Sequence, residues 1–346
     1  MKKYIKRITY LFFFATLFAT LLPAATGCMR GNNAPPLNEI TEKTAFSMDT
    51  VAKITVYGDS EVAEVAIVAA FERLERLDEV FNYYNPESEL SHINATAYGK
   101  ATEIGDDMYE MIRAGLICSK VTDGAFDISL GLLIDLWGDE KTPSKSVIEL
   151  LLPKLGYENI VVKDENGLRT VEYLNESVKI HFGAIAKGYA VDELILVLSE
   201  KGVKSAMVDI GGEIGVIGES PHEDGLWRVG IRDPFNTGEI IETIKLSEGY
   251  AVATSGNYER GEHIFDPKTG FPVDIDYSAV TVVGSSGTKA DAFATAFFVT
   301  GIENCTEEMG YACVICVDKE GNVGGDCSVN CNHDVVYSGG GGTALD

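Results

Sequence analysis

The apolar residues between positions 61 and 81 recur at a helical spacing. They are separated by four, three, three and four positions, which places them on one face of a helix. These residues are Ile67, Phe71, Leu74, Leu77 and Phe81. The pattern predicts an amphipathic helix over residues 61–81, which the turn-forming residues at 82–87 end.

Similar patterns predict the other elements of the chain. Further helices are expected at residues 106–121, 146–155, 184–201 and 289–300. Strands are expected at residues 46–57, 159–163, 170–181, 206–217, 227–231, 239–246, 250–254, 279–283 and 311–317. Because helices and strands are interspersed without a regular strand–helix–strand rhythm, we expect an α+β fold and not a doubly wound α/β fold.

The first 27 residues differ from the rest of the chain. A basic start precedes an uncharged run over residues 8–27, which ends in small residues before Cys28. This pattern predicts a lipoprotein signal peptide with Cys28 as the lipid-attachment residue, and the alternative is an uncleaved membrane helix. We expect a tether over residues 28–43, a folded domain over 44–336 and a flexible tail over 337–346. The domain would then be anchored on the extracytoplasmic side of a bacterial membrane.

Composition and charge narrow the class of ligand. The chain has 346 residues, 45% of them apolar, and a formal net charge of −25. It is long enough to bury a large core. Its field repels phosphate backbones and anionic lipid headgroups, so nucleic acid is not an expected partner. An anionic ligand would need a local cation, a lysine or a helix N-terminus to bind.

The cysteines do not indicate a metal site. Cys313 and Cys316 are three residues apart in an apolar strand, where side chains alternate between the two faces of a sheet. They should therefore point in opposite directions and serve as small buried apolar residues. A disulfide between Cys327 and Cys331 is one possibility outside the cytoplasm, but the spacing does not fix the connectivity.

The chain lacks a GxxxxGK[ST] loop, an HExxH motif and a GxSxG motif. The glycines at 211–215 have the wrong spacing for a dinucleotide-binding fingerprint, and close packing of the backbone at a strand bend explains them better. Chemistry is instead suggested by Asp291 and Thr295, four apart on one helix face, because a carboxylate and a hydroxyl offer the hard oxygens that suit Mg²⁺. The alternative is an acidic residue near a helix N-terminus and a core threonine.

Two further segments could contribute to a site. Residues 181–189 pass from strand to helix through small residues, so exposed backbone near the helix start, with Lys187, could hold a pyrophosphate. A tight turn with a solvated lysine is the alternative. His263 is a candidate for moving a proton near neutral pH. It precedes the turn-forming residues 266–270, which include Asp266.

Together these motifs resemble the ApbE family of FAD:protein FMN transferases. The resemblance extends from about residue 46 to residue 335 and includes GAIAKGYAVD at 183–192 and ADAFAT at 290–295. The other matching segments are residues 46–50, 84–88, 123–127, 136–138, 209–212, 254–256 and 263–270. Each segment is weakly specific, but their common order along the chain is strong evidence.

The resemblance implies an ApbE-like, T-fold-like mixed fold with a mainly antiparallel sheet. It also implies an enzyme that uses FAD and Mg²⁺, links FMN to a Thr or Ser hydroxyl of an acceptor protein and releases AMP. The acceptor is expected to be a separate protein, such as a subunit of a membrane electron-transfer complex. The implied flavin-contacting residues are Met48, Tyr84, Ala125, Phe126, Asp127, His181, Lys187 and Phe265. The implied metal site consists of Asp291, Thr295 and the backbone carbonyl of Ala184.

This chain departs from the family pattern at several positions. Members commonly have an aspartate where this chain has His181, an aliphatic residue in place of Phe265 and a glycine in place of Asp49. Some members have a further carboxylate where this chain has Ala294.

In the mechanism that we expect, a cation and Lys187 neutralise the pyrophosphate, and His263, or else Asp266, takes a proton from the acceptor hydroxyl. Tyr84 could cover the flavin ring or be a core residue at a helix end. Two other functions remain open, namely hydrolysis of FAD to FMN and AMP, and flavin binding without turnover.

Overall fold

The computed structural model describes residues 39–138, 142–236, 238–258, 261, 263–304, 309–327 and 335–337. The expected signal peptide, Cys28, most of the expected tether and residues 338–346 lie outside this part of the chain. The tether was expected to extend to residue 43, but the first strand already begins at residue 40. Among the described residues, no helix is both long and apolar enough to cross a membrane.

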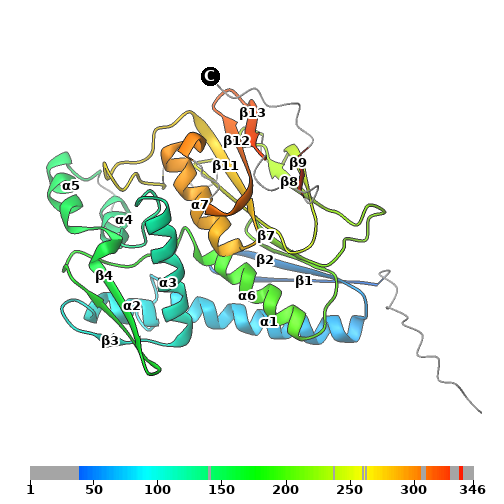
Figure 1. Ribbon diagram of the computed structural model, residues 1–346, viewed down its shortest axis with the longest axis horizontal. Coiled ribbons are helices and arrows are strands. Elements are labelled where there is room, and N and C mark those ends of the chain that lie inside the picture. The colour runs from blue at the N-terminus through cyan, green and yellow to red at the C-terminus, as the bar shows by residue number, and fades with distance from the viewer. Residues whose placement is uncertain are drawn as a thin grey trace, which may run out of the picture. The chain divides into compact units, whose positions relative to one another are not determined.

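The centre of the fold is an eight-stranded sheet (Figure 1). Its strands lie in the order β1-β2-β6-β7-β10-β11-β12-β13, and each neighbouring pair is antiparallel. They span Ile40–Ser47, Thr50–Tyr57, Ala206–Ile210, Glu213–Ile217, Ala251–Gly256, Tyr277–Gly284, Tyr311–Asp318 and Val323–Asp326. The expected α+β class with a mainly antiparallel sheet is confirmed.

Three helices pack on one face of this sheet, namely α1 (Ser60–Phe81), α6 (Ala186–Glu200) and α7 (Gly287–Thr300) (Figure 1). Helix α1 begins where the Asp59 carboxylate accepts hydrogen bonds from the N–H groups of Glu61 and Val62, at 2.9 and 3.1 Å. Its buried side chains recur at a helical spacing and include the predicted residues except Phe71, which is only partly buried. They are Ala63, Ala66, Ile67, Ala70, Leu74, Leu77 and Phe81.

The opposite face of the sheet is covered by a smaller sheet in the order β14-β9-β8. These strands span Val335–Tyr337, Ile240–Leu246 and Trp227–Arg232. A second apolar core lies between the two sheets. The central sheet therefore separates two cores, and strand β12 buries apolar residues in both of them.

The two cysteines of β12 point to opposite faces, as expected, because Cys313 lies in the core between the sheets and Cys316 in the core beneath the helices. Cys313 forms a disulfide with Cys327, which follows β13. The structure thus corrects two expectations: Cys313 is not a free apolar residue, and Cys327 pairs with it and not with Cys331. The pairing joins adjacent strands, which the sequence spacing could not reveal. Cys331 lies outside the described residues.

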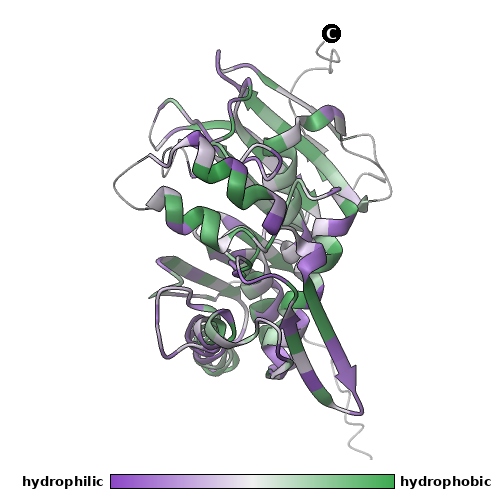
Figure 2. Cartoon of the chain, turned by 90° about the vertical axis from the view of Figure 1, so that its left-hand side faces the viewer, coloured by the Kyte–Doolittle hydropathy of each residue, from purple (hydrophilic) through white to green (hydrophobic). Residues whose placement is uncertain are grey.

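A second group of elements lies beside the end of the central sheet (Figure 1). It contains a three-stranded sheet in the order β3-β5-β4, with strands Thr102–Glu103, Leu168–Tyr173 and Ile160–Glu165. Its helices are α2 (Glu89–Thr96), α3 (Asp106–Val121), α4 (Gly131–Gly138) and α5 (Lys145–Leu151). The hairpin of β4 and β5 ends in a hydrophilic tip (Figure 2).

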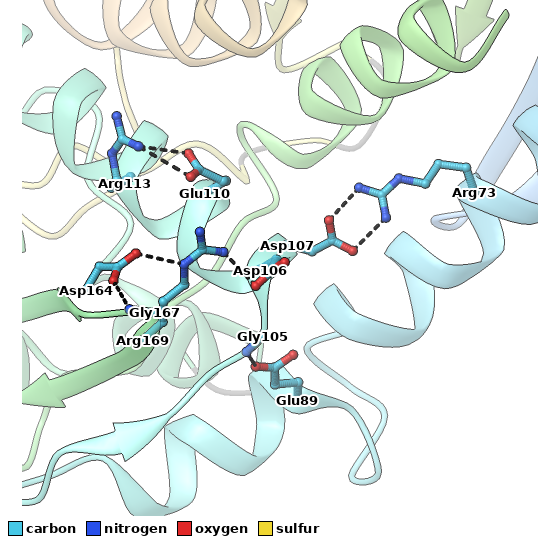
Figure 3. Close-up of polar contacts among 10 residues, drawn as sticks. All are labelled: Arg73, Glu89, Gly105, Asp106, Asp107, Glu110, Arg113, Asp164, Gly167 and Arg169. Atoms are coloured by element: carbon cyan, nitrogen blue, oxygen red, sulfur yellow. Dashed lines mark hydrogen bonds and ion pairs between the residues drawn. The ribbon is translucent and has the colours of Figure 1, made fainter. Parts of the chain in front are cut away.

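Ion pairs connect this group to the helix layer (Figure 3). Arg73 of α1 binds both carboxylate oxygens of Asp107 at the start of α3, and it also pairs with Glu193 of α6. Arg169 of β5 lies 2.6 Å from Asp106 and 3.1 Å from Asp164. The Arg73 contacts therefore fix α1, α3 and α6 relative to one another.

Several predicted elements need correction. The strand expected at 46–57 is a hairpin of β1 and β2, because Met48 and Asp49 take left-handed backbone angles and turn the chain. The strand expected at 206–217 is likewise a hairpin, turned by Gly211 and Gly212. The strand expected at 170–181 ends at Tyr173. Helices α2 and α4 and strand β3 were not predicted, since each is too short to show a clear period.

Helices α6 and α7 approach each other at two glycines. A β-carbon added at Gly188 would overlap the carbonyl oxygen of Gly287 and would lie 2.7 Å from the β-carbon of Asp291. Next to this contact, the Asp192 carboxylate accepts hydrogen bonds from the N–H groups of Gly287 and Thr288, at 2.6 and 3.0 Å. The start of α7 is therefore held on α6 by close backbone packing and by hydrogen bonds from its first N–H groups to Asp192.

Replacement of Gly188 by alanine is expected to destabilise the protein by about 3 kcal/mol or more, because the new methyl group must push the two helices apart. Urea unfolding followed by circular dichroism measures this free energy. Gly138→Ala is the matched control, since an added β-carbon there meets no atom within 4 Å. Equal stability of the two variants would contradict the close contact.

Candidate active site

A cavity of about 280 Å³ opens where the helix layer, the ends of the central strands and the second group of elements meet. Its volume is near the lower end of the range for small-molecule sites. Residues from separate segments of the sequence line it. Among those predicted from the sequence, they are Tyr84, Ala125, Phe126, Asp127, His181, Ala184, Lys187, His263, Phe265, Asp291 and Thr295. The structure thus brings together most of the predicted site.

Two predicted residues are not part of the cavity wall. Met48 lies in the turn between β1 and β2, where its N–H donates to the Asp78 carboxylate at 3.1 Å. Asp266 uses its carboxylate to accept a hydrogen bond from the N–H of Lys268 at 2.8 Å, within the turn at 266–270. The turn therefore explains Asp266 without a ligand, and His263 is the better placed of the two candidate bases.

Asp291 and Thr295 lie on one face of α7 and both face the cavity. Asp291 is only 3% exposed, and one of its oxygens accepts a hydrogen bond from the N–H of Gly188 at 2.9 Å. Burial raises the pKa of Asp291, while the ammonium of Lys187 and the Gly188 N–H act in the opposite direction. The Thr295 hydroxyl lies 2.9 Å from that of Ser255. The pair is thus part of the cavity wall and not of a solvated helix end.

Lys187 lies in the first turn of α6 and forms an ion pair with Glu213, the first residue of β7. Glu213 is 2% exposed and lines the same cavity. Burial raises the pKa of Glu213 and Asp291 adds to this shift, whereas the ammonium of Lys187 opposes it and favours the charged carboxylate. One Glu213 carboxylate oxygen, Oε2, is buried without a hydrogen-bond partner. Lys187 is therefore not the solvated lysine of the alternative interpretation.

Sequence reasoning missed Glu213, because it treated residues 211–215 only as a glycine-rich bend. A signal was present: a glutamate follows a glycine pair between two apolar strands, and a buried carboxylate in such a place needs a partner. The partner, Lys187, lies 26 residues earlier in the chain. Only the folded structure identifies it.

His181 occupies the cavity wall as a neutral side chain. Its ring packs edge-on against Tyr83, with ring centroids 4.7 Å apart, and its Nδ1 accepts a hydrogen bond from the N–H of Gly183 at 3.1 Å. Burial lowers the pKa of His181 to about 4. At neutral pH this position therefore offers an uncharged imidazole and no negative charge.

Aromatic side chains form two other parts of the wall. Tyr84 is 72% exposed at the cavity, so it is not a core residue and its ring is open to a ligand. Phe265 stacks on Trp137, with ring centroids 5.5 Å apart and an interplanar angle of 26°. The Trp137 indole N–H donates to the carbonyl oxygen of Gly270 at 2.9 Å. This bond ties the turn at 266–270 to α4.

The segment 125–127 forms a structured part of the wall. The Asp127 carboxylate accepts hydrogen bonds from the N–H groups of Ser129 and Tyr157, at 2.7 and 3.0 Å. Burial raises the pKa of Asp127, and these hydrogen bonds oppose the shift. The carboxylate therefore holds two loops together, while the buried side chains of Ala125 and Phe126 supply apolar surface.

The donor set suits a hard cation and a phosphate-bearing ligand. The cavity combines a buried carboxylate, hydroxyls, a lysine and the N-terminal end of α6, where backbone N–H groups favour anions. Within the described part of the chain, no group of three or more His, Cys, Asp or Glu side chains is placed to hold a metal ion. A cation here would take its other ligands from hydroxyls, backbone carbonyls, water and the bound molecule, which is common for Mg²⁺.

Comparisons with known proteins identify the family of this chain. The sequence model of the ApbE family matches residues 48–314. A FAD:protein FMN transferase from Treponema pallidum is 30% identical over 278 residues, covering 73% of this chain and 77% of that protein. One from Haemophilus influenzae is 30% identical over 240 residues, covering 65% of this chain and 69% of that protein.

Solved structures show the same fold. The ApbE protein from Thermotoga maritima superposes with a TM-score of 0.74 at 30% identity, covering 82% of this chain and 96% of that chain. The flavinyl transferase ApbE from Pseudomonas stutzeri, in its apo form, gives a TM-score of 0.72 at 28% identity and covers 83% of this chain and 95% of that chain. The expected ApbE-like fold is confirmed, and the chain belongs to the ApbE family.

Proposed function

We propose that this protein is an enzyme that transfers the FMN part of FAD to a hydroxyl group of an acceptor protein. The observation that carries the proposal is the convergence of Asp291, Thr295, Lys187 and His263 on one cavity with an exposed aromatic ring, that of Tyr84. These residues could bind the pyrophosphate of FAD, stack against its flavin ring and remove a proton from the acceptor hydroxyl. The related proteins from Treponema pallidum and Haemophilus influenzae are named for this activity.

The reaction balances without a covalent enzyme intermediate. The oxygen of an acceptor Thr or Ser attacks the FMN phosphorus of FAD and forms a phosphoester bond. The bond between that phosphorus and the bridging oxygen breaks, so AMP leaves with the electron pair. The hydroxyl proton passes to a base. The nucleophile belongs to the acceptor, so no serine or cysteine of this chain needs to react.

His263 is the residue that would take the proton. It is exposed at the cavity, and its Nδ1 lies 2.8 Å from the carbonyl oxygen of Gly261. A carbonyl can only accept a hydrogen bond, so Nδ1 carries the proton in this contact and Nε2 has a lone pair. The backbone thus sets the tautomer that a general base requires.

Asp291, Thr295 and the backbone carbonyl of Ala184 would hold a Mg²⁺ ion, because they offer the oxygen ligands that this ion takes. The ion, when bound, neutralises phosphate charge and polarises the phosphorus. Lys187 adds a positive charge at the same wall, and the N-terminal end of α6 adds partial charge. These groups offset the repulsion that a chain of net charge −25 exerts on FAD.

We further infer that the protein is a lipoprotein attached through Cys28 to the extracytoplasmic face of a bacterial membrane. The basic, apolar and small-residue pattern of residues 1–28 supports this location. The disulfide between Cys313 and Cys327 supports it independently, because disulfides persist mainly in oxidising compartments. An acceptor at this location would be a protein at the membrane, such as a subunit of an electron-transfer complex.

The test is to incubate the protein with FAD, Mg²⁺ and a library of ten-residue peptides that each contain one threonine, and to measure peptide mass. A peptide that gains the mass of FMN, with AMP in equal amount, supports transfer. Free FMN with AMP and unmodified peptides would indicate a hydrolase. Unchanged FAD would indicate binding without turnover. Either of these last two results would contradict the proposed transfer.

Asp291→Ala is expected to lower the rate of AMP release by roughly a hundredfold or more, and Lys187→Ala by roughly tenfold. The first change removes the carboxylate that holds the cation, whereas the second removes an auxiliary charge. Circular dichroism checks that both variants fold. Equal and mild losses in the two variants would contradict the metal assignment to Asp291.

His181 is expected to make the protein less stable in mild acid. Its pKa is about 4 in the folded protein and about 6.5 in an unfolded chain, so the unfolded state binds the proton first as pH falls. Stability should decrease by about 2 kcal/mol between pH 7 and pH 5 from this group. His181→Asn, which keeps an acceptor for Gly183, should remove that part of the decrease in urea unfolding. The same decrease in both proteins would contradict the assignment to His181.

A further inference from the structure

Lys187 acts between two carboxyl groups in the cavity wall. Its ammonium forms an ion pair with Glu213, and its positive charge also lowers the pKa of Asp291. Asp291 in turn raises the pKa of Glu213, so the three groups interact with one another. Lys187 can therefore pair either with Asp291, the carboxylate that would hold a cation, or with Glu213, which sequence reasoning did not identify.

The backbone of Glu213 is fixed by the central sheet, whereas the side chain of Lys187 is flexible. It pairs in register with Ile210 directly after the turn at Gly211 and Gly212, in the middle of the central sheet. The turn is itself held, because the N–H of Gly212 donates to the Asp209 carboxylate at 2.8 Å. Lysine, by contrast, has a flexible four-carbon stem and can change partners at low cost.

We propose that Glu213 is a positioning residue that holds the ammonium of Lys187 and thereby leaves the Asp291 carboxylate available to the divalent cation. This inference rests on the proposed function, in which Asp291 binds that cation. It assigns a role to a residue that takes no direct part in the transfer. It also accounts for a buried glutamate in the wall of a site for an anionic ligand.

Lys187 and the cation compete for one carboxylate, that of Asp291. Without an acceptor at position 213, the partly buried ammonium loses its ion-pair partner on the sheet while Asp291 stays near it, and such a loss is costly. Lys187 would then pair with Asp291, occupy its oxygen and repel an approaching Mg²⁺ ion. The arrangement with Glu213 avoids this, because the ammonium already has a partner on the sheet. The unpartnered Oε2 of Glu213 offers a further acceptor to the same ammonium.

The experiment measures the Mg²⁺ concentration at which FAD binding is half-maximal, by quenching of flavin fluorescence at a fixed FAD concentration. Glu213→Leu removes the acceptor with little change of size, and Glu213→Gln keeps an acceptor oxygen. The double variant Glu213→Leu with Lys187→Met removes the competing ammonium as well. Glu193→Leu is the matched control, since Glu193 is a partly buried glutamate of α6 that pairs with Arg73 outside the cavity.

Glu213→Leu is expected to raise the Mg²⁺ requirement by roughly tenfold. Glu213→Gln should stay within about threefold of the parent protein, because it still accepts a hydrogen bond from Lys187. The double variant should require less Mg²⁺ than Glu213→Leu alone, which a merely structural role of Glu213 would not produce. Glu193→Leu should leave the requirement unchanged.

Two results would overturn the inference. An unchanged Mg²⁺ requirement in Glu213→Leu, or a requirement that stays high in the double variant, would show that Glu213 does not keep Lys187 from Asp291. The proposed function would survive either result, since the parent protein would still bind FAD with Mg²⁺. If the parent protein does not bind FAD at any Mg²⁺ concentration, the proposed function itself fails, and this inference fails with it.

Discussion

The site depends on the burial of one carboxylate, Asp291, at the contact between α6 and α7. The carboxylate reaches the N–H of Gly188 at 2.9 Å because neither Gly188 nor Gly287 has a side chain to separate the helices. That contact also sets Lys187, one residue before Gly188, beside Asp291. A buried carboxylate is unfavourable without partners, so this geometry is retained at a cost in stability that a bound cation and its ligand can offset.

The negative net charge of the chain explains why an anionic ligand needs local positive charge in the cavity. A protein of net charge −25 repels FAD, whose pyrophosphate carries two negative charges. In the proposed function, four features of the cavity offset this repulsion: a lysine, the N-terminal end of α6, a neutral imidazole at His181 and a carboxylate that would bind a cation. The low pKa of His181 matters here, because burial prevents it from serving as a permanent positive charge. We therefore infer that the cation, and not His181, would neutralise most of the phosphate charge.

Sequence reasoning was most successful where the signal is local. The helix at 106–121 was predicted with the boundaries that the structure shows, and Asp291 and Thr295 were placed on one face from their spacing alone. Hairpins were harder, because Met48 and Asp49 reverse the chain without a glycine. Long-range pairs could not be predicted at all. The partners of Glu213 and Cys313 follow from which strands and helices become neighbours, and that information is not present in any single segment.

The central claim is that Asp291 and Thr295 hold a divalent cation against the phosphates of bound FAD. Crystals of the protein grown with FAD and Mn²⁺, a Mg²⁺ substitute that scatters anomalously, test it most directly. The account predicts an anomalous peak within about 2.0–2.4 Å of an Asp291 carboxylate oxygen and the Thr295 hydroxyl, with phosphate oxygens completing the coordination. FAD bound in the cavity with no such peak, or with a peak away from Asp291, would contradict it.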